Sequence, residues 1–185
     1  MIRRDMDEEV INQWREAVKS EVVDATMRSL YAAIEAATLE RRPRCDQSGR
    51  CCHFDRFGHR LYSTGLEVAS FLRKLNRPVS AHELARSERE GVCPFLVDGL
   101  CSVHDMRPMG CRIYFCDPTA SDWQNDLYER SHHRIAALHE EQDIPYRYGE
   151  WGQMLSLCIG DGLNRPSSAD NATRLPKLVH VRITC

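Results

Sequence analysis

The sequence predicts a small, mainly α-helical protein with one short β-hairpin, that is, a small α+β fold. Three observations support this fold class. Apolar residues recur at steps of three and four along several stretches, two Ser/Thr-x-x-Glu patterns indicate helix starts, and an Asp-Gly pair separates two short apolar runs. We expect a long N-terminal helix in residues 1–44, a cysteine-rich domain in 45–118, and a C-terminal helical extension in 119–185. The 185 residues suffice for these parts to pack as a single compact unit.

Residues 7 to about 40 are predicted to form one long amphipathic helix. Glu8 and Glu9 suit the positive end of the helix dipole, and Pro43 stops the helix. The apolar positions that define its buried face are Ile11, Trp14, Val18, Val23, Met27, Leu30, Ile34 and Ala37. We expect this helix to be a scaffold that packs on the rest of the chain.

Two shorter helices are predicted next, each beginning with the spacing of a capping box. The two capping pairs are Thr64 with Glu67 and Ser80 with Glu83. The first helix covers 65–75, and Gly91 closes the second. Together they turn the chain back and bring the cysteines from residue 93 onward towards the earlier ones.

The stretch "CPFLVDGLCSVH" predicts a tight β-hairpin, because Asp98-Gly99 is a favoured two-residue turn. In this register Leu96 faces Cys101. Side chains alternate along a strand, so Cys93 and Cys101 would point to opposite faces of the ribbon. They can converge only if Cys93 has left the ladder of strand hydrogen bonds.

Further elements are predicted towards the C-terminus. Pro108 suits the start of a short helix, which ends between Cys111 and Cys116 because these positions lie about 140° apart on a regular helix. The remaining predictions are a helix over 121–141, a shorter helix that buries Trp151, Leu155 and Cys158, an exposed loop over 161–176, and a last strand over 178–183.

Composition excludes several classes of partner. The net charge is −2, with 42% apolar and 28% charged residues, which argues against binding nucleic acid or an acidic membrane by charge. The first residues hold four acids and no apolar run of the length a signal peptide needs. No later segment approaches the length of a membrane span. We therefore expect a cytoplasmic protein with reduced thiols, which binds neither nucleic acid nor membranes.

The cysteines are the most informative residues of the sequence. Nine cysteines in a reducing compartment favour metal ligands over disulfides, and an odd number cannot pair fully. Only Cys158 and Cys185 lie outside residues 45–116. The seven clustered cysteines are Cys45, Cys51, Cys52, Cys93, Cys101, Cys111 and Cys116. Burial alone would scatter cysteines along the chain, so we predict that these seven supply the ligands of a metal centre.

The spacing favours an iron–sulfur cluster, such as [4Fe–4S], over Zn²⁺. Structural zinc sites usually show C-x(2–4)-C knuckles in pairs, and the clustered cysteines contain no such pair of knuckles. Iron–sulfur clusters accept irregular spacings and require apolar shelter, which Phe95, Leu96 and Ile113 can supply. Seven thiols exceed the four that one centre needs, so some have another role. Zinc and a set of free thiols stay open as alternatives.

The pattern "CDQSGRCC", followed by "CPFL", "GLCSVH" and "RPMGCRIYFC", resembles the YkgJ-like family of zinc- or iron-chelating cysteine-cluster domains. The family pattern usually has one more cysteine shortly before the Cys-Cys pair, where this chain has Ser48-Gly49-Arg50. A related segment occurs in flagellin lysine N-methylases. The resemblance implies metal binding by the clustered cysteines and raises lysine methylation as an alternative function.

Basic residues and histidines near the cysteines have two interpretations each. Arg107 and Arg112 are candidates for stabilising a sulfur-rich centre by their charge, since nearby cations lower thiol pKa values. Alternatively they form ion pairs with Asp105 or Asp117. His104 and His53 are possible ligands, although packing explains His104 better.

Three functions therefore stay open. The first is a metal-binding protein whose centre is structural, redox-active or used in metal delivery. The second is an enzyme of the flagellin lysine N-methylase type. The third is a metal-free thiol redox sensor that uses Cys51 and Cys52.

Overall fold

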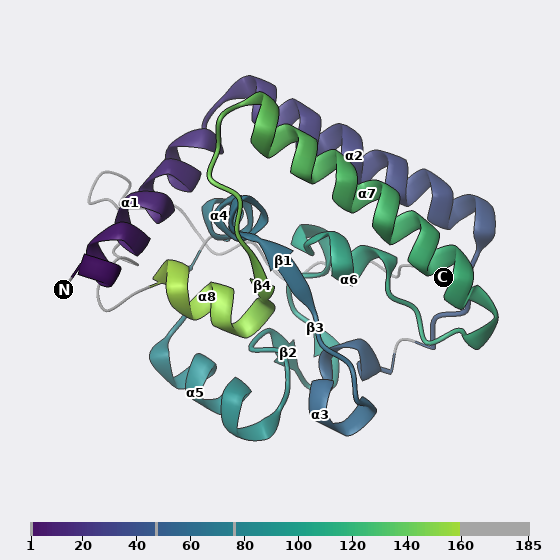
Figure 1. Ribbon diagram of the computed structural model, residues 1–185. Helices are drawn as coiled ribbons and strands as arrows, with labels where there is room; N and C mark the ends of the chain where they lie inside the picture. Colours follow the sequence, from purple (N-terminus) through teal and green to yellow (C-terminus); the bar gives the residue numbers. More distant parts are fainter. Residues whose placement is uncertain (1, 47, 76, 160–185) are drawn as a thin grey trace, which may run out of the picture.

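A computed structural model describes residues 2–46, 48–75 and 77–159 of the chain (Figure 1). The protein is mainly α-helical with a short β-hairpin, as the sequence predicts. None of the helices in this described part is both long and apolar enough to cross a membrane. The predicted loop over 161–176 and strand over 178–183 lie outside the described residues.

The N-terminal segment forms two helices, so the prediction of one long helix is wrong. Helix α1 spans Ile2–Ala17 and α2 spans Glu21–Arg41. Between them, Ser20 is extended, with φ −65° and ψ 131°. The break follows from packing: α1 contacts α4, whereas α2 contacts α7, and a straight helix could not reach both. One irregularity of the sequence indicates this break: the apolar residues Val18 and Val23 are separated by five positions rather than three or four.

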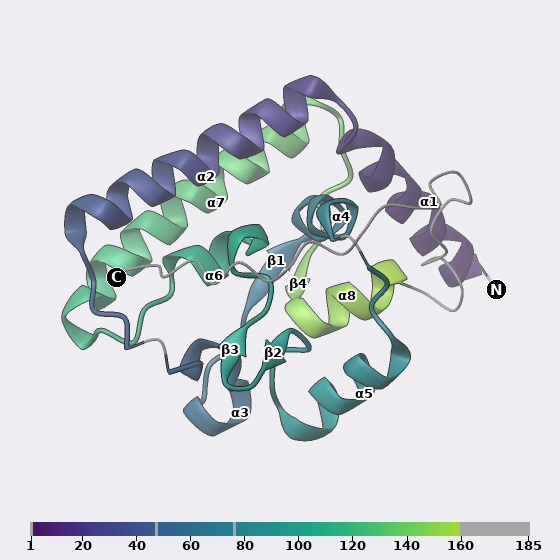
Figure 2. The ribbon, with the colours of Figure 1, turned by 180° about the vertical axis from the view of Figure 1, so that it is seen from behind.

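Helices α2 and α7 (Ser121–Glu141) lie side by side and antiparallel, as both ribbon views show (Figures 1 and 2). The span of α7 matches the predicted 121–141. A short helix, α6 (Met109–Ile113), packs against both. The buried residues of this layer are Leu30, Ile34, Met109, Ile113, Leu127 and Ile135. This layer therefore anchors the helix that carries Cys111.

The two predicted capping boxes are both formed. Helix α4 spans Gly65–Lys74 and begins with reciprocal hydrogen bonds between Thr64 and Glu67. Helix α5 spans Ala81–Glu90, begins with the same arrangement between Ser80 and Glu83, and ends at left-handed Gly91. These helices return the chain to its first cysteine group, as expected from the sequence.

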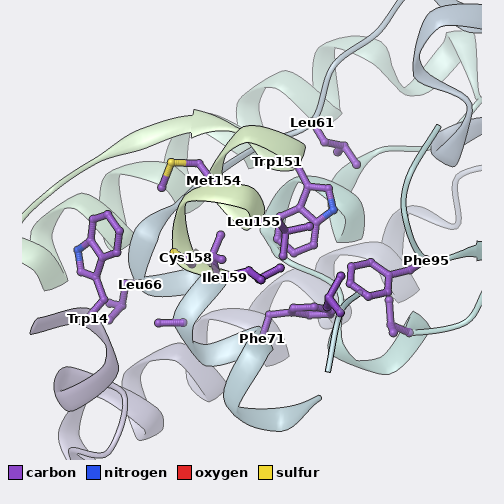
Figure 3. Packing of buried hydrophobic residues seen from close by; sticks show 14 of the residues in the cluster. Trp14, Leu61, Leu66, Phe71, Phe95, Trp151, Met154, Leu155, Cys158 and Ile159 are labelled. Atoms are coloured by element: carbon purple, nitrogen blue, oxygen red, sulfur yellow. The ribbon is translucent and has the colours of Figure 1, made fainter. Parts of the chain in front are cut away.

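The main core lies between α1, α4 and α8 (Trp151–Ile159), with the aromatic rings of Figure 3 at its centre. The rings of Phe71 and Trp151 are 5.1 Å apart, and those of Phe71 and Phe95 are 4.9 Å apart, both edge to face. Trp14 donates a hydrogen bond from Nε1 to the carbonyl of Pro145 at 2.7 Å. Trp151, Leu155 and Cys158 are buried, as predicted. The core thus reaches Phe95, two residues after Cys93.

Two small antiparallel sheets complete the described fold. Strand β2 (Leu96–Val97) pairs with β3 (Leu100–Cys101) in the predicted register, with Leu96 opposite Cys101. Asp98 and Gly99 have φ of 50° and 76°, as a tight hairpin turn requires. Strand β1 (Tyr62–Thr64) pairs with β4 (Tyr148–Glu150), a pairing that the sequence did not predict.

Candidate metal centre

The first cysteine group lies on a tight turn that only glycine fits. Gly49 has φ +66° and precedes a 3₁₀ turn, Arg50–Cys52, whose Cys52 N–H donates to the Gly49 carbonyl at 2.8 Å. A Cβ atom on Gly49 would lie 2.3 Å from the carbonyl oxygen of Gly99 in the hairpin turn. The absence of a side chain therefore lets the two cysteine segments touch.

The second cysteine group is joined to the first through the backbone. The N–H of Cys93 donates to the carbonyl of Cys52 at 2.7 Å, and the Cys93 carbonyl accepts from Leu96 N–H at 3.1 Å. The Asp55 N–H also donates to the Gly91 carbonyl at 3.1 Å. Cys93 has thus left the hairpin ladder, which satisfies the condition for its convergence with Cys101.

Cys52 is the centre of a thiol cluster drawn from both segments. Its side chain is in hydrogen-bonding contact with the thiols of Cys51, Cys93 and Cys101. Cys111, on α6, is close enough to interact electrostatically with Cys51, Cys93 and Cys101. We call these residues the five-thiol cluster: Cys51, Cys52, Cys93, Cys101 and Cys111.

Four thiols of the five-thiol cluster have shifted pKa values, two of them lowered and two raised. The pKa of Cys51 is lowered to about 6 and that of Cys101 to about 7, chiefly because the Cys52 thiol donates a hydrogen bond to the sulfur. Cys52 has one proton, so it donates to one of them at a time. The pKa of Cys52 is raised, first because its proton is held by Cys101 and Cys51. Burial raises the pKa of Cys111.

The other cysteines are placed differently. Cys116 is half-buried and feels the charge of Cys51, so it lies at the edge of the five-thiol cluster. Cys45 is exposed. Cys158 is a buried thiol on α8 in the apolar core, and Cys185 lies outside the described residues. The structure therefore gathers five of the seven candidate ligands closely and a sixth at their edge.

Arg107 is the cation of the cluster. Its positive charge lowers the pKa of Cys51, Cys101 and Cys111. Its Nε donates to the His104 carbonyl at 2.9 Å and its guanidinium donates to the Cys111 carbonyl at 3.1 Å, which fix it beside the sulfurs.

Arg112 is held one step further out. Its guanidinium donates to the carbonyls of Arg107 and Asp105, at 2.7 and 2.6 Å, and lies 4.5 Å from the ring centre of Tyr31. It therefore braces the loop that carries Arg107, by backbone hydrogen bonds rather than by the ion pair with the Asp105 or Asp117 carboxylate considered from the sequence.

His59, which the sequence did not single out as part of a site, lies close to the five-thiol cluster. His59 Nε2 is 3.1 Å from the carbonyl oxygen of Cys51, and its ring stacks on Tyr114 with centres 4.6 Å apart. Its Nδ1 is buried without a hydrogen-bond partner. A lone histidine seven residues after the Cys-Cys pair gives no spacing signal, so only the fold could show this contact.

Glu67 connects the main core to the cluster. Its carboxylate is fully buried, caps α4, and accepts a hydrogen bond from the Met109 N–H at 2.8 Å, at the start of α6. Burial raises its pKa. The capping role is readable from the sequence, whereas the hydrogen bond to Met109 is long-range and is not.

Comparison with known proteins identifies this region. Residues 44–134 match the family model CxxCxxCC, described as "Putative zinc- or iron-chelating domain". This segment of the chain is therefore similar to the CxxCxxCC domains. The match covers every cysteine of the five-thiol cluster, and it supports metal binding as the general function. No curated protein and no solved structure matches the chain.

The donor set of this CxxCxxCC-like segment fits a soft or borderline metal. Thiolates are the ligands that zinc and iron–sulfur clusters share, and Arg107 offsets part of their negative charge. Within residues 2–46, 48–75 and 77–159, no three His, Cys, Asp or Glu side chains surround a common point as metal ligands do. The thiols instead contact one another around Cys52. Metal binding thus requires that protons leave these thiols and that their side chains reorient.

Proposed function

We propose that the CxxCxxCC-like segment of this chain holds an iron–sulfur cluster through thiolates of the five-thiol cluster. The contact of Cys52 with thiols from both chain segments carries the proposal. Cys45 and Cys116, the outer two of the seven candidates, are proposed to assist at the edge, as ligands or replacement thiols. An iron–sulfur cluster bound there would transfer electrons or serve as a source of metal for delivery to another protein.

The surroundings and the thiols of the site suit an iron–sulfur cluster. The five thiols exceed the four that either a zinc ion or a [4Fe–4S] cluster takes, so their number does not separate the two. The surroundings of the five-thiol cluster are apolar on one side, where Phe95, Leu96 and Ile113 are buried. The two most acidic thiols, Cys51 and Cys101, come from different segments, so deprotonation prepares ligands on both halves of the site.

The test is the metal content of protein purified without oxygen. A [4Fe–4S] protein is brown, absorbs near ~400 nm, and contains iron and acid-labile sulfide, whereas a zinc protein is colourless. Serine substitution of each clustered cysteine in turn, with iron and sulfide as readout, identifies the ligands. Cys158→Ser is the matched control, because Cys158 is buried outside the cluster. Stoichiometric zinc without iron would replace the iron–sulfur proposal, and absence of both metals would end it.

A metal-free thiol redox sensor is the second candidate, favoured by one observation. Cys51 is half-buried with a pKa lowered to about 6, and its neighbour Cys52 can resolve an oxidised sulfur by forming a disulfide. In that case peroxide would yield a Cys51–Cys52 or Cys51–Cys101 disulfide in protein that never contained metal, as peptide mass spectrometry would show. The methylase-type enzyme stays a prediction from the resemblance alone. The cytoplasmic location stays a prediction from the hydropathy of the sequence.

A further inference from the structure

The surface directly outside the five-thiol cluster exposes apolar side chains among arginines. Phe57, at the end of the short helix α3 (Phe54–Phe57), is 41% exposed. In the hairpin turn, Val97 is 51% and Leu100 58% exposed. Side chains alternate along a strand, so Val97 and Leu100 point outward while their neighbours Leu96 and Cys101 point inward.

Arg50 and Gly49 link these exposed residues to one another. Arg50 lies over the ring of Phe57 at 5.5 Å, and Arg56 lies over the same ring at 5.4 Å. Gly49, next to Arg50, is packed against Gly99 in the hairpin turn. Both ribbon views place α3 beside the β2–β3 hairpin (Figures 1 and 2). We call this surface the docking patch; its residues are Arg50, Arg56, Phe57, Val97 and Leu100.

The charge of the docking patch is unbalanced. In the part of the chain that the structure describes, neither Arg50 nor Arg56 is paired with a carboxylate, and their neighbour Asp55 is engaged by Arg60 at 2.6 Å. Two guanidinium groups held on one exposed aromatic ring are a preformed site for carboxylates that surround an apolar side chain. Asp98, in the hairpin turn, is also exposed and carries one negative charge, so with Arg50 and Arg56 the docking patch and its turn have a net charge of +1 (two positive, one negative) in a chain whose net charge is −2.

We propose that the docking patch binds a partner protein through an acidic surface with an apolar residue at its centre, and that this partner exchanges metal or electrons with the thiol centre. The proposal rests on the proposed function. Arg50 precedes Cys51 and Leu100 precedes Cys101, so a protein seated here contacts the residues next to two cluster thiols. Electron and metal transfer both need such a short separation.

A protein suits the patch better than a nucleic acid or a lipid surface. Single-stranded nucleic acids bind along an extended basic groove with several aromatic rings, whereas this patch has one exposed ring, Phe57, beside the aliphatic Val97 and Leu100. Binding to an anionic membrane needs a cluster of several basic residues, and this patch has two arginines. Aliphatic side chains among arginines match the core and rim of a small protein interface.

The test uses a fluorescent peptide of Glu, Asp and Leu residues as the probe, with a second peptide in which Lys replaces each acid. Anisotropy is measured with the full chain, at low and at high salt. We expect the acidic peptide to bind, the basic peptide not to bind, and the affinity to fall as salt screens the arginines. The double charge reversal Arg50→Glu/Arg56→Glu should weaken binding at least about tenfold. Arg130→Glu/Arg134→Glu, on the exposed face of α7, is the matched control and should bind as the wild type does.

A second pair of variants tests the apolar part. Leu100→Ser should weaken binding of the acidic peptide, whereas Leu39→Ser should not, since Leu39 is 68% exposed on the distant helix α2. Equal binding by all variants, or no binding by the wild type, would overturn the docking patch. Binding of an oligothymidine or a phosphatidylserine vesicle in place of the acidic peptide would also overturn the proposal. A dimer in sedimentation that Leu100→Ser dissociates would overturn it as well.

Metal content measured on the same preparations separates the two proposals. If the wild type holds no metal but the acidic peptide binds as expected, the proposed function fails and the patch stands as a protein-binding surface. If metal is present and binding does not depend on the patch, the docking proposal fails alone.

Discussion

The apolar core and the five-thiol cluster both bury a cysteine, and the two cysteines have different chemistry. Cys158 is 2% exposed among the hydrocarbon and aromatic side chains of α1, α4 and α8 (Figure 3), and burial raises its pKa to about 12. Cys52 is 6% exposed, yet it contacts three other thiols. Burial alone therefore does not determine the chemistry of a cysteine thiol. The groups that contact its sulfur determine it.

Replacing each of these two buried cysteines should give the largest difference between the two regions. Cys52→Ser should lose the bound metal, whereas Cys158→Ser should retain it and lose only core packing. Metal bound to the folded state alone stabilises it, so a chelator should lower the melting temperature of the wild type and of Cys158→Ser. The same chelator should leave Cys52→Ser unchanged. Retention of full metal content by Cys52→Ser would contradict the central place of this residue.

Thiol reactivity should show the next largest difference. In reduced, metal-free protein, the rate of Cys51 alkylation by iodoacetamide should rise with pH, with a midpoint at about pH 6 where half of the thiol is ionised, and level off at higher pH. Cys158, with its pKa raised to about 12, should react more than roughly a hundredfold more slowly at neutral pH. Peptide mass spectrometry over time measures both rates. Arg107→Ala should move the Cys51 midpoint upward, and an unchanged midpoint would show that Arg107 does not act on this thiol.

Glu67 joins the two regions, and its loss should weaken both. Glu67→Ala removes the acceptor of the Thr64 N–H, which is one half of the α4 capping box, and leaves the buried Met109 N–H without its acceptor. We expect a loss of about 3 kcal/mol in the free energy of unfolding, measured in urea. Glu83→Ala is the control, because Glu83 accepts from the Ser80 N–H in the same way at a half-buried position, where it also pairs with Arg77. A similar loss in both variants would show that the contact with Met109 contributes little.

The same carboxyl should also make stability depend on pH. Burial raises the folded-state pKa of Glu67 above 4.5, so the folded state favours the protonated form. This favourable contribution is complete below pH 4.5 and is lost as the pH rises through the folded-state pKa. Glu67→Gln, which cannot ionise, should lack this part of the pH dependence. Unfolding titrations of both proteins across this range measure the difference, and parallel curves would contradict the assignment.

Two glycines with the same φ provide the finest comparison. Gly49 and Gly58 both have φ +66°, so alanine costs either position about 1 kcal/mol of backbone strain. At Gly49 the new Cβ would also meet the Gly99 carbonyl, whereas Gly58 has open space. Gly49→Ala should therefore cost about 2 kcal/mol more than Gly58→Ala and should reduce metal content. Equal effects would show that the contact between the turns can open without penalty.

Local signals predicted much of the fold. Capping boxes, the Asp-Gly turn and the period of α7 are set by residues close in sequence, and each element appears as expected. The break at Ser20 depends on the different partners of α1 and α2, which a periodic pattern does not contain. Strands β1 and β4 are three residues each and pair across most of the chain, so no local pattern indicates them.

The sequence likewise predicted some features of the site and not others. Cysteine spacing predicted that two segments would meet, and the condition placed on Cys93 is satisfied. The spacing could not rank the thiols, because the central place of Cys52 comes from a turn that Gly49 allows. The contact of His59 with Cys51 likewise depends on the left-handed Gly58 that follows α3.

The hydrogen bond from Cys93 to Cys52 sets an order for assembly during synthesis. The two residues are separated by a 40-residue excursion, so at about 5–20 residues per second the ribosome delivers the first cysteines some seconds before their partners. During that interval the nascent chain offers only adjacent thiols without the scaffold that holds them. The two cysteine groups can therefore meet only after α4, α5 and the cysteines that follow them have emerged, so the length of this excursion sets the shortest delay before the five-thiol cluster can form.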